Sequence, residues 1–273
     1  MDYIIELIKY IILGIIQGIT EIFPVSSSGH LVLFSHLFMG GEDLNQSLTL
    51  FLMITNIGSF LALLIFYIKD VKELIVDSWK FVFTKEREKS QQNFFYVLKL
   101  IIAVVPIGIV GLLFKDLIPT NLLSVGISLI VTSLLLLGIY LLRHRTFEND
   151  ITYKNALIIG LFQMFAVLPG LSRSGITMVG GLSQRITLSK VIKFSFLSYL
   201  IVSIPVSLLG LYDAIKNPGT IDILGFSLAF IFSFIFSYLT VHVMSKFVKV
   251  KNLIWFSIYA FTVGIISIIL FII

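Results

Sequence analysis

The most constraining feature of this sequence is a series of apolar runs, each about as long as a membrane is thick. A helix needs about 20 consecutive apolar residues to cross the hydrocarbon of a bilayer. Six runs meet that length without interruption, namely 48–68, 94–114, 121–142, 190–211, 222–245 and 252–273. Because only 13% of the residues are charged, about half the share in a soluble domain, we interpret the chain as an integral membrane protein. Apolar runs continue to the last residue, so a signal peptide alone does not explain them.

The amino-acid composition also excludes several kinds of functional site. The chain has no cysteine, which excludes disulfides, thiolate metal sites and cysteine nucleophiles. Its net charge of +5 is explained by basic cytoplasmic loops rather than by a nucleic-acid partner. The longest polar stretch runs from Lys69 to Asn93 and is predicted to be a loop. We therefore expect residues 1–273 to form a single membrane domain.

Two further apolar runs are broken by polar and helix-breaking residues. Residues 4–38 and 154–184 each contain a short run, a Pro/Ser/Gly break and a second short run. Broken backbone at membrane depth is tolerated only where protein or a water-filled cavity satisfies its polar groups. Both segments are therefore predicted to be re-entrant helix–loop–helix hairpins.

The two broken segments also resemble each other at an offset of 146 residues. The identities are Gly14 with Gly160, Gln17 with Gln163, Ser26 with Ser172, Ser28 with Ser174, and Gly29 with Gly175. Each half, 1–146 and 147–273, is then one hairpin followed by three spans. Because three crossings is an odd number, the second hairpin must enter from the opposite face. The predicted fold is an all-α polytopic membrane protein, with six full transmembrane helices and two re-entrant hairpins in an inverted-topology repeat.

The distribution of basic residues predicts the orientation. In this topology 14 Lys and Arg residues lie on the side opposite the termini, and 3 lie on the side of the termini. Cytoplasmic loops carry the excess of basic residues. Both termini are therefore expected outside the cell.

The first hairpin carries an acid and a base. Gln17 and Glu21 are four residues apart and share one face of a helix. Pro24 ends that helix, and the serines that follow offer N-cap hydroxyls to the next one. His30 is then expected in the first turn of that second helix.

The second hairpin has the same outline with different chemistry. Val167 stands at the position of Glu21, Ile176 at that of His30, and Thr177 at that of Leu31. Arg173 stands at the position of Ser27. If the two tips meet, the acid and base of one half and the cation of the other complete a single asymmetric site.

Such a site suits a phosphate or diphosphate. Two helix N-termini would bring unpaired N–H groups and partial positive charge, and Arg173 adds a planar fork for phosphate oxygens. The hydroxyls expected to contribute are those of Ser26, Ser28, Ser172, Ser174 and Thr177. Glu21 and His30 are superfluous for simply holding an anion, so we predict that the site transfers a phosphoryl group.

Structural interpretations compete with this one. The serines are also typical of helix caps and packing residues, and His30 is as well suited to a cap as to catalysis. Asn56 favours an interhelical hydrogen bond over a site role. Arg173 is hardest to explain structurally, because an unpaired guanidinium at membrane depth costs at least roughly 2.5 kcal/mol. It needs either Glu21 or a ligand.

The motifs resemble those of a known family. The first motif runs from Gln17 through Glu21 and continues with Pro24-Val25-Ser26-Ser27-Ser28-Gly29-His30. The second is Pro169-Gly170-Leu171-Ser172-Arg173-Ser174-Gly175-Ile176-Thr177. Together they match the signature of the undecaprenyl-diphosphatase (bacitracin-resistance) family. The resemblance covers the whole chain. It implies hydrolysis of undecaprenyl diphosphate to the monophosphate in the bacterial plasma membrane, which recycles the lipid carrier for cell-wall synthesis. It also implies a site that opens to the outer face.

The resemblance carries specific residues and a cofactor with it. Glu21, Ser27, His30, Ser172, Arg173 and Thr177 inherit active-site status, and a divalent cation, Mg²⁺ or Ca²⁺, is implied. Glu21 is the expected metal ligand. Gln17 stands at the first acidic position of the motif and is a second candidate ligand, although its amide carries no charge.

The chemistry of each side chain suggests a role in the site, which we state as a hypothesis. Arg173 clamps the diphosphate, Glu21 holds the metal or tunes His30, and the nucleophile is His30, Ser27 or water. The prenyl tail is expected in a groove between spanning helices. The partners expected are the prenyl diphosphate lipid and the bilayer, with a homodimer as one alternative for the oligomeric state.

Two other functions compete with hydrolysis. A lipid-phosphate flippase or anion transporter could use the same midplane site, because opposed hairpins suit transport as well as catalysis. A purely structural scaffold would leave Arg173 and Glu21 without a purpose.

Overall fold

The structure is a computed structural model that describes residues 2–39, 44–85, 87–114, 117–216 and 222–273. Those residues form helices and no β-strand, with one isolated bridge between Asn149 and Ile186. The helices of the first half are α1 (Asp2–Ile22), α2 (Ser27–Met39), α3 (Leu44–Phe66), α4 (Ile68–Phe83), α5 (Arg87–Phe114) and α6 (Leu122–Leu141). Those of the second half are α7 (Tyr153–Gln163), η2 (Met164–Val167), α8 (Arg173–Leu182), α9 (Leu188–Lys216), α10 (Ile223–Phe247), η3 (Val250–Asn252) and α11 (Leu253–Ile272).

The predicted membrane architecture is confirmed, with two changes in how the spans are built. Within the described ranges six helices are long and apolar enough to cross a membrane, and a seventh span is gained if the bent pair α3–α4 is counted as one. Five of the predicted spans fall on α5, α6, α9, α10 and α11. The sixth, 48–68, lies in α3, which bends by 74° into α4. The first arm of the first hairpin, α1, is itself long enough to span.

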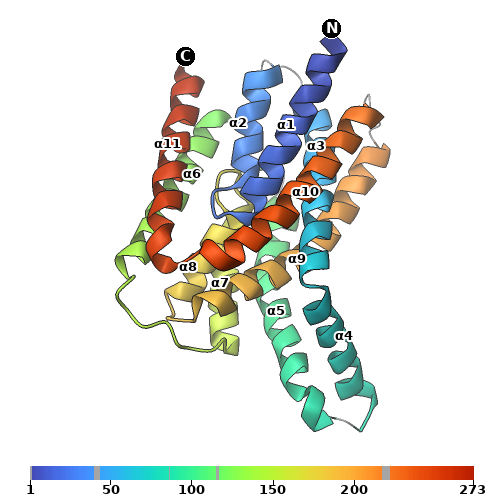
Figure 1. The fold of residues 1–273 in the computed structure, drawn as a ribbon, viewed down its shortest axis with the longest axis vertical. Coiled ribbons are helices and arrows are strands. Elements are labelled where there is room, and N and C mark those ends of the chain that lie inside the picture. Colours follow the sequence, from blue (N-terminus) through green and yellow to red (C-terminus); the bar gives the residue numbers. More distant parts are fainter. Residues whose placement is uncertain (1, 40–43, 86, 115–116, 217–221) are drawn as a thin grey trace.

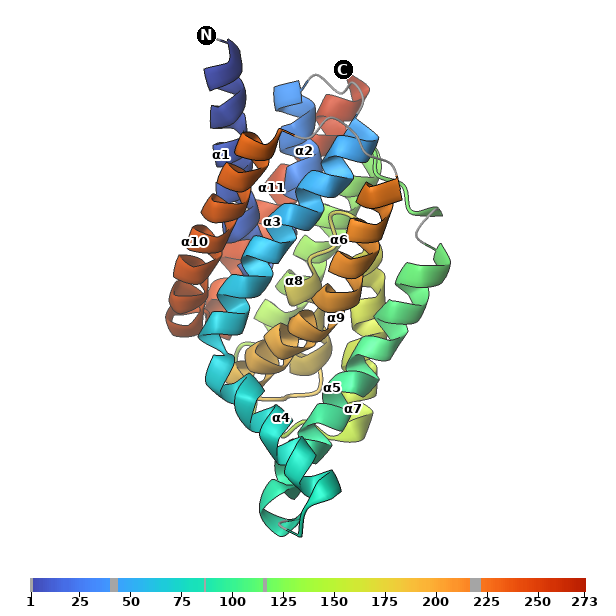
Figure 2. The same ribbon diagram turned by 90° about the vertical axis from the view of Figure 1, so that its right-hand side faces the viewer.

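The stretch from Lys69 to Asn93, predicted to be a loop, is largely helical. It forms α4 and the beginning of α5, which project together beyond the rest of the bundle (Figures 1 and 2). The rings of Phe81 and Phe94 stack at 4.3 Å, and the side-chain amide of Asn93 donates a hydrogen bond to Asp77 over 2.6 Å. The prediction was wrong because it weighed the charges and overlooked the helical spacing of the apolar residues between them.

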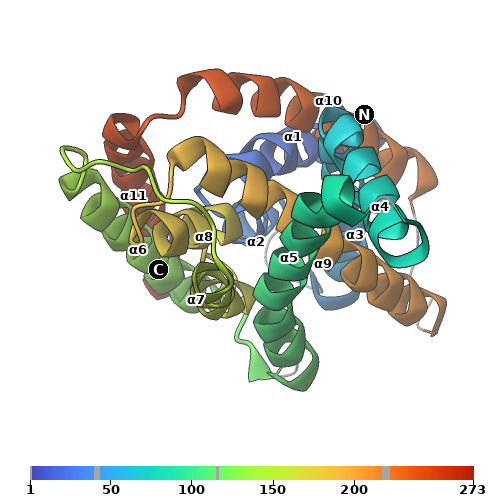
Figure 3. The ribbon, with the colours of Figure 1, turned by 90° about the horizontal axis from the view of Figure 1, so that it is seen from below.

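The two hairpins lie toward opposite ends of the molecule. The start of α1 and the end of α11 share one end, α2 lies beside α1 near it, and α7 lies toward the other end (Figures 1 and 2). The short helix α8 sits in the middle of the bundle (Figure 3), and its residues from Ser174 to Leu182 are all buried. Arg173, its first residue, is the exception.

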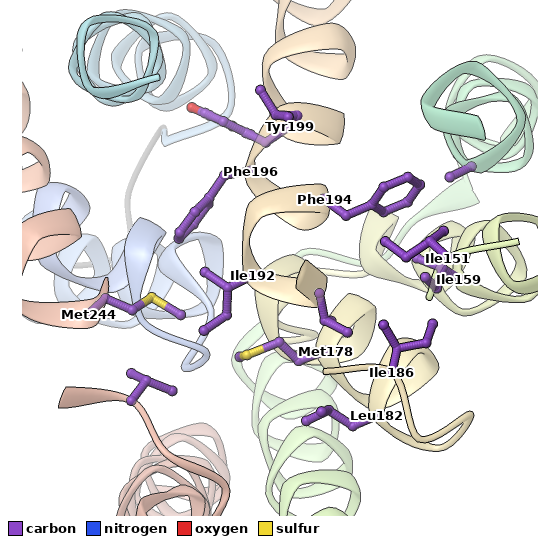
Figure 4. Close-up of a cluster of buried hydrophobic side chains, with 14 of the residues drawn as sticks. Ile151, Ile159, Met178, Leu182, Ile186, Ile192, Phe194, Phe196, Tyr199 and Met244 are labelled. Carbon is purple, nitrogen blue, oxygen red and sulfur yellow. The ribbon is translucent and has the colours of Figure 1, made fainter. Parts of the chain in front are cut away.

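The largest core cluster is organised around α9. Phe194 and Phe196 project from α9 to opposite sides (Figure 4), where they meet side chains of the surrounding helices. Met178 of α8 and Met244 of α10 belong to the same cluster. α9 therefore ties the second hairpin to the spans of both halves.

The first arms of the two hairpins make equivalent contacts. A Cβ atom on Gly14 would lie 2.5 Å from the carbonyl oxygen of Ala229, and one on Gly160 would lie 2.7 Å from that of Ala103. Each arm thus packs closely against a span of the other half, α1 on α10 and α7 on α5. The inverted repeat remains our proposal from the sequence, and this pair of contacts supports it.

Candidate active site

The tips of the two hairpins touch. A Cβ atom on Gly29 would lie 2.9 Å from Cα of Gly170, and one on Gly175 would lie 3.4 Å from Cβ of Pro24. The Ser174 hydroxyl also donates a hydrogen bond across the junction to the Phe23 carbonyl, at 3.3 Å. Gly170 has a φ of +94°, a conformation that glycine adopts without steric cost. The residues of the two breaks are therefore brought to one place.

Each break ends in a serine that caps the following helix. The side chain of Ser26 accepts a hydrogen bond from the Gly29 N–H over 3.3 Å, and that of Ser172 accepts one from the Gly175 N–H over 3.1 Å. Their hydroxyls lie 3.4 Å from Ser28 and 3.3 Å from Ser174, respectively. These contacts agree with the structural interpretation of the two serines as helix caps. Contact of the same hydroxyls with a diphosphate stays a prediction.

The opposite charges of the two hairpins form an ion pair across the junction. The Arg173 guanidinium bonds to Oε1 of Glu21, whose side chain is only 6% exposed. The other carboxylate oxygen accepts hydrogen bonds from the Ser27 hydroxyl and, at 3.1 Å, from the Gln17 amide nitrogen. The partner that Arg173 needs at membrane depth is therefore Glu21, and three of the four predicted catalytic residues are in direct contact.

Two residues outside the motifs hold this cluster in place. The Arg173 guanidinium lies over the ring of Tyr199, 3.8 Å from its centroid. The Tyr199 hydroxyl donates to the backbone carbonyl of Asn56 over 3.2 Å, and the Asn56 side chain accepts from Gln17 over 2.9 Å. Asn56 thus makes the expected interhelical bond and joins the site as well. The only sequence signal for Tyr199 is that a tyrosine within a span needs a partner for its hydroxyl.

The fourth predicted residue, His30, faces different partners. The residue is 1% exposed, and Nδ1 donates to the Ser26 carbonyl over 2.7 Å. Nε2 lies 2.8 Å from the hydroxyl of Tyr259 on α11. In the part of the chain that the structure describes, the ring nitrogens bond to Ser26 and Tyr259 and not to Glu21, so direct tuning of His30 by Glu21 is not what the structure shows. Sequence reasoning missed Tyr259 altogether.

The remaining predicted ligand, Thr177, lies behind the tip. Its hydroxyl donates to the Arg173 carbonyl over 2.8 Å and lies within hydrogen-bonding distance of Ser195 on α9. It therefore fixes the first turn of α8, which carries Arg173.

The donor set around Glu21 fits a metal ion only in company with a phosphate. Among the described residues no group of three or more His, Cys, Asp or Glu side chains could hold a metal ion. Glu21 offers a single carboxylate, with the Gln17 amide beside it. Because Mg²⁺ is commonly held by one or two carboxylates together with substrate phosphates, these residues fit a cation that arrives with, and is shared by, a bound diphosphate.

Comparisons with known proteins agree with the motifs. The family model described as bacitracin resistance protein BacA matches residues 10–266. The chain is 74% identical over 277 residues to the undecaprenyl-diphosphatase of Acholeplasma laidlawii, covering 100% of both chains. It is 38% identical to the undecaprenyl-diphosphatase of Oceanobacillus iheyensis over 96% of each chain. It is also 39% identical to undecaprenyl-diphosphatase 1 of Bacillus licheniformis, over 97% of this chain and 98% of that one.

Proposed function

The chain belongs to the BacA family, and from that membership together with the site geometry we propose that it hydrolyses undecaprenyl diphosphate to undecaprenyl phosphate and inorganic phosphate. This reaction recycles the lipid carrier for cell-wall synthesis and gives resistance to bacitracin. The observation that carries the proposal is the Glu21–Arg173 pair formed across the two hairpin tips. It sets a cation and an acid beside two helix N-termini, as an anionic substrate requires.

Binding of the diphosphate changes the partner of Arg173. In the structure the guanidinium is neutralised by Glu21. A diphosphate carries more charge than one carboxylate and presents oxygens that match the guanidinium fork. The Arg173 side chain is 22% exposed, so a ligand can reach it. Tyr199 lies against one face of the guanidinium and keeps it at the tip while it exchanges partners.

The first turns of α2 and α8 supply the remaining contacts. The first N–H groups of a helix have no intrahelical partner and point at the N-terminus, where an anion is stabilised. Ser27 lies in the first turn of α2, where its hydroxyl can turn from Glu21 to a phosphate oxygen. During hydrolysis the bond between the terminal phosphorus and the bridging oxygen breaks, and an oxygen from water bonds to that phosphorus. Arg173 then stabilises the charge that develops on the transferred group.

A divalent cation completes the proposal. Once Arg173 has moved to the substrate, the Glu21 carboxylate and the Gln17 amide would hold a Mg²⁺ or Ca²⁺ ion against the diphosphate. When bound, such an ion neutralises phosphate charge and stabilises the leaving group. The cation is therefore expected to be required for turnover and dispensable for folding.

We place the protein in the bacterial cell membrane with its termini outside, on the strength of the basic residues at the opposite end. The resemblance to the family further implies that the site opens toward the outer face. The residues of the proposed site come from both hairpins of the same chain, and a homodimer stays one alternative for the oligomeric state.

The test is phosphate release by the purified protein in detergent micelles, with a prenyl diphosphate as substrate and Mg²⁺ as cofactor. Arg173→Lys and His30→Ala are expected to lose most activity. Two matched controls are available. Arg143→Lys alters an arginine that stacks on Tyr140, and His242→Ala alters a histidine whose Nδ1 also bonds to a carbonyl four residues earlier. Both controls should stay active, and full activity in either site variant would remove that residue from the mechanism.

The same preparation separates hydrolysis from transport. Absence of phosphate release by the wild-type protein, combined with movement of a labelled lipid phosphate across liposomes, would replace the proposed phosphatase by a flippase.

A further inference from the structure

Among the residues that the structure describes, the side chain from another helix that bonds to the His30 imidazole is that of Tyr259. Its hydroxyl lies 2.8 Å from Nε2 of His30, and the two rings are nearly parallel, with 7° between their planes. His30 is 1% exposed, whereas Tyr259 is 45% exposed. The phenol thus lies at the open side of a histidine that is otherwise enclosed.

Helix α6 links the two helices that carry this pair. Val32 and Leu33, two and three residues beyond the histidine on α2, belong to one buried cluster with Leu129 of α6 and with Val263, one turn beyond Tyr259 on α11. Nearer the break, the ring of Phe23 packs 5.2 Å from that of Phe256 on α11. Contacts on both sides therefore hold α11 in register with α2, and the Tyr259 hydroxyl stays opposite Nε2.

The hydrogen bonds of His30 decide which of its atoms can react. A carbonyl oxygen can only accept, so Nδ1 must carry the proton that it donates to Ser26. In the neutral ring Nε2 is then the only nitrogen with a free electron pair, and in the free protein that pair accepts from the Tyr259 hydroxyl. Whether His30 attacks phosphorus itself or takes a proton from water, the reacting group must reach Nε2. It must therefore come to the place that the Tyr259 hydroxyl occupies.

We propose that Tyr259 is a further substrate-contacting residue: its hydroxyl covers Nε2 of His30 in the free protein and turns to donate a hydrogen bond to an oxygen of the terminal phosphoryl group when the diphosphate binds. A phosphorus attacked by Nε2 itself lies about 3–3.5 Å from that nitrogen, and one attacked by a water bound to Nε2 lies one hydrogen bond farther away. Its oxygens then fall within reach of a hydroxyl that starts 2.8 Å from the same nitrogen. This change of acceptor exposes Nε2 only when a phosphate is present to accept the hydrogen bond of the Tyr259 hydroxyl. This inference rests on the proposed phosphatase function.

The test compares Tyr259→Phe with the wild-type protein in the micelle assay. The variant keeps the ring and loses only the donor. Because a hydrogen bond to a charged group contributes about 1.5–3 kcal/mol, kcat/KM should fall about 10- to 100-fold, and inhibition by inorganic phosphate should weaken in step. Tyr238→Phe is the matched control, since the contacts of its ring with Phe234 and His242 survive the change. A melting temperature equal to that of the wild type shows that the loss is not one of folding.

A second measurement needs no active variant. The chain has 4 histidines, so ¹⁵N-histidine spectra can be assigned with His30→Ala. The Nε2 resonance of His30 should shift when inorganic phosphate is added to the wild-type protein, and it should already be shifted in Tyr259→Phe without phosphate. A Tyr259→Phe variant within twofold of wild-type kcat/KM, or an Nε2 resonance indifferent to both changes, overturns the role of Tyr259. A wild-type protein that releases no phosphate overturns the proposed function instead.

Discussion

Replacing Gly29 by alanine tests whether the two hairpin tips must touch for the site to work. The added Cβ would lie 2.9 Å from Cα and 3.2 Å from N of Gly170, where ordinary contact begins at 3.4 Å. Both partners are backbone atoms, so no side-chain rotation can relieve the overlap. The tips must therefore move apart by about 0.5 Å.

The expected effect of Gly29→Ala is larger on activity than on stability. Overpacking of this kind costs about 1–3 kcal/mol of unfolding free energy. A misplacement of about 1 Å between reacting groups can cost about 100-fold in rate, so a shift of half that size should lower kcat about 10-fold or more. Glu21 and Arg173 lie on opposite sides of the junction, so moving the tips apart changes the distance between these two side chains.

The assay is phosphate release together with thermal unfolding in the same micelles. Gly108→Ala in α5 is the matched control, because nothing lies within 4 Å of its added Cβ and alanine is favoured over glycine in a helix by about 1 kcal/mol. The control should be as active as the wild type and no less stable. If Gly29→Ala kept wild-type kcat while Gly108→Ala behaved as expected, the contact between the tips would not be needed for catalysis.

Three further predictions concern the same site. Arg173→Met should lower the unfolding free energy by about 3–5 kcal/mol, because it leaves the buried Glu21 carboxylate unpaired. Adding Glu21→Gln should recover part of that loss, and strictly additive single and double variants would contradict the pairing. Tyr199→Leu removes the aromatic ring that lies against the Arg173 guanidinium, so KM for the prenyl diphosphate should rise about 3- to 10-fold. An unchanged KM would show that the ring only fills space. A chelator should abolish phosphate release and leave the melting temperature unchanged; a lowered melting temperature would indicate a resident structural metal.

Sequence reasoning reached most of the fold and predicted that residues of the two breaks would meet. Apolar length alone located five of the six spans, because crossing the hydrocarbon imposes a minimum run that few other structures require. The break residues predicted which segments would meet, and the cost of an unpaired charge at membrane depth predicted that Arg173 would pair either with Glu21 or with a ligand. The prediction failed for α4, where interspersed charges obscured a helical pattern of apolar residues.

The residues that the sequence did not indicate come from distant helices. Tyr199 lies 26 residues beyond Arg173 and Tyr259 lies 229 beyond His30, and neither belongs to a motif. A tyrosine in an apolar run looks the same whether it faces lipid or a buried partner. Only the crossing of α9 and α11 past the hairpin tips distinguishes these two from the other tyrosines.

The amino-acid sequence by itself determined that this chain crosses a membrane and interrupts two of its apolar segments with polar residues, because both properties depend on local composition. The tertiary structure alone decided that Glu21 meets Arg173 while His30 turns to Tyr259. Those choices depend on how helices far apart in the chain pack, down to the close approach that Gly29 allows, and packing at that scale is set by the sum of many contacts rather than by any one segment.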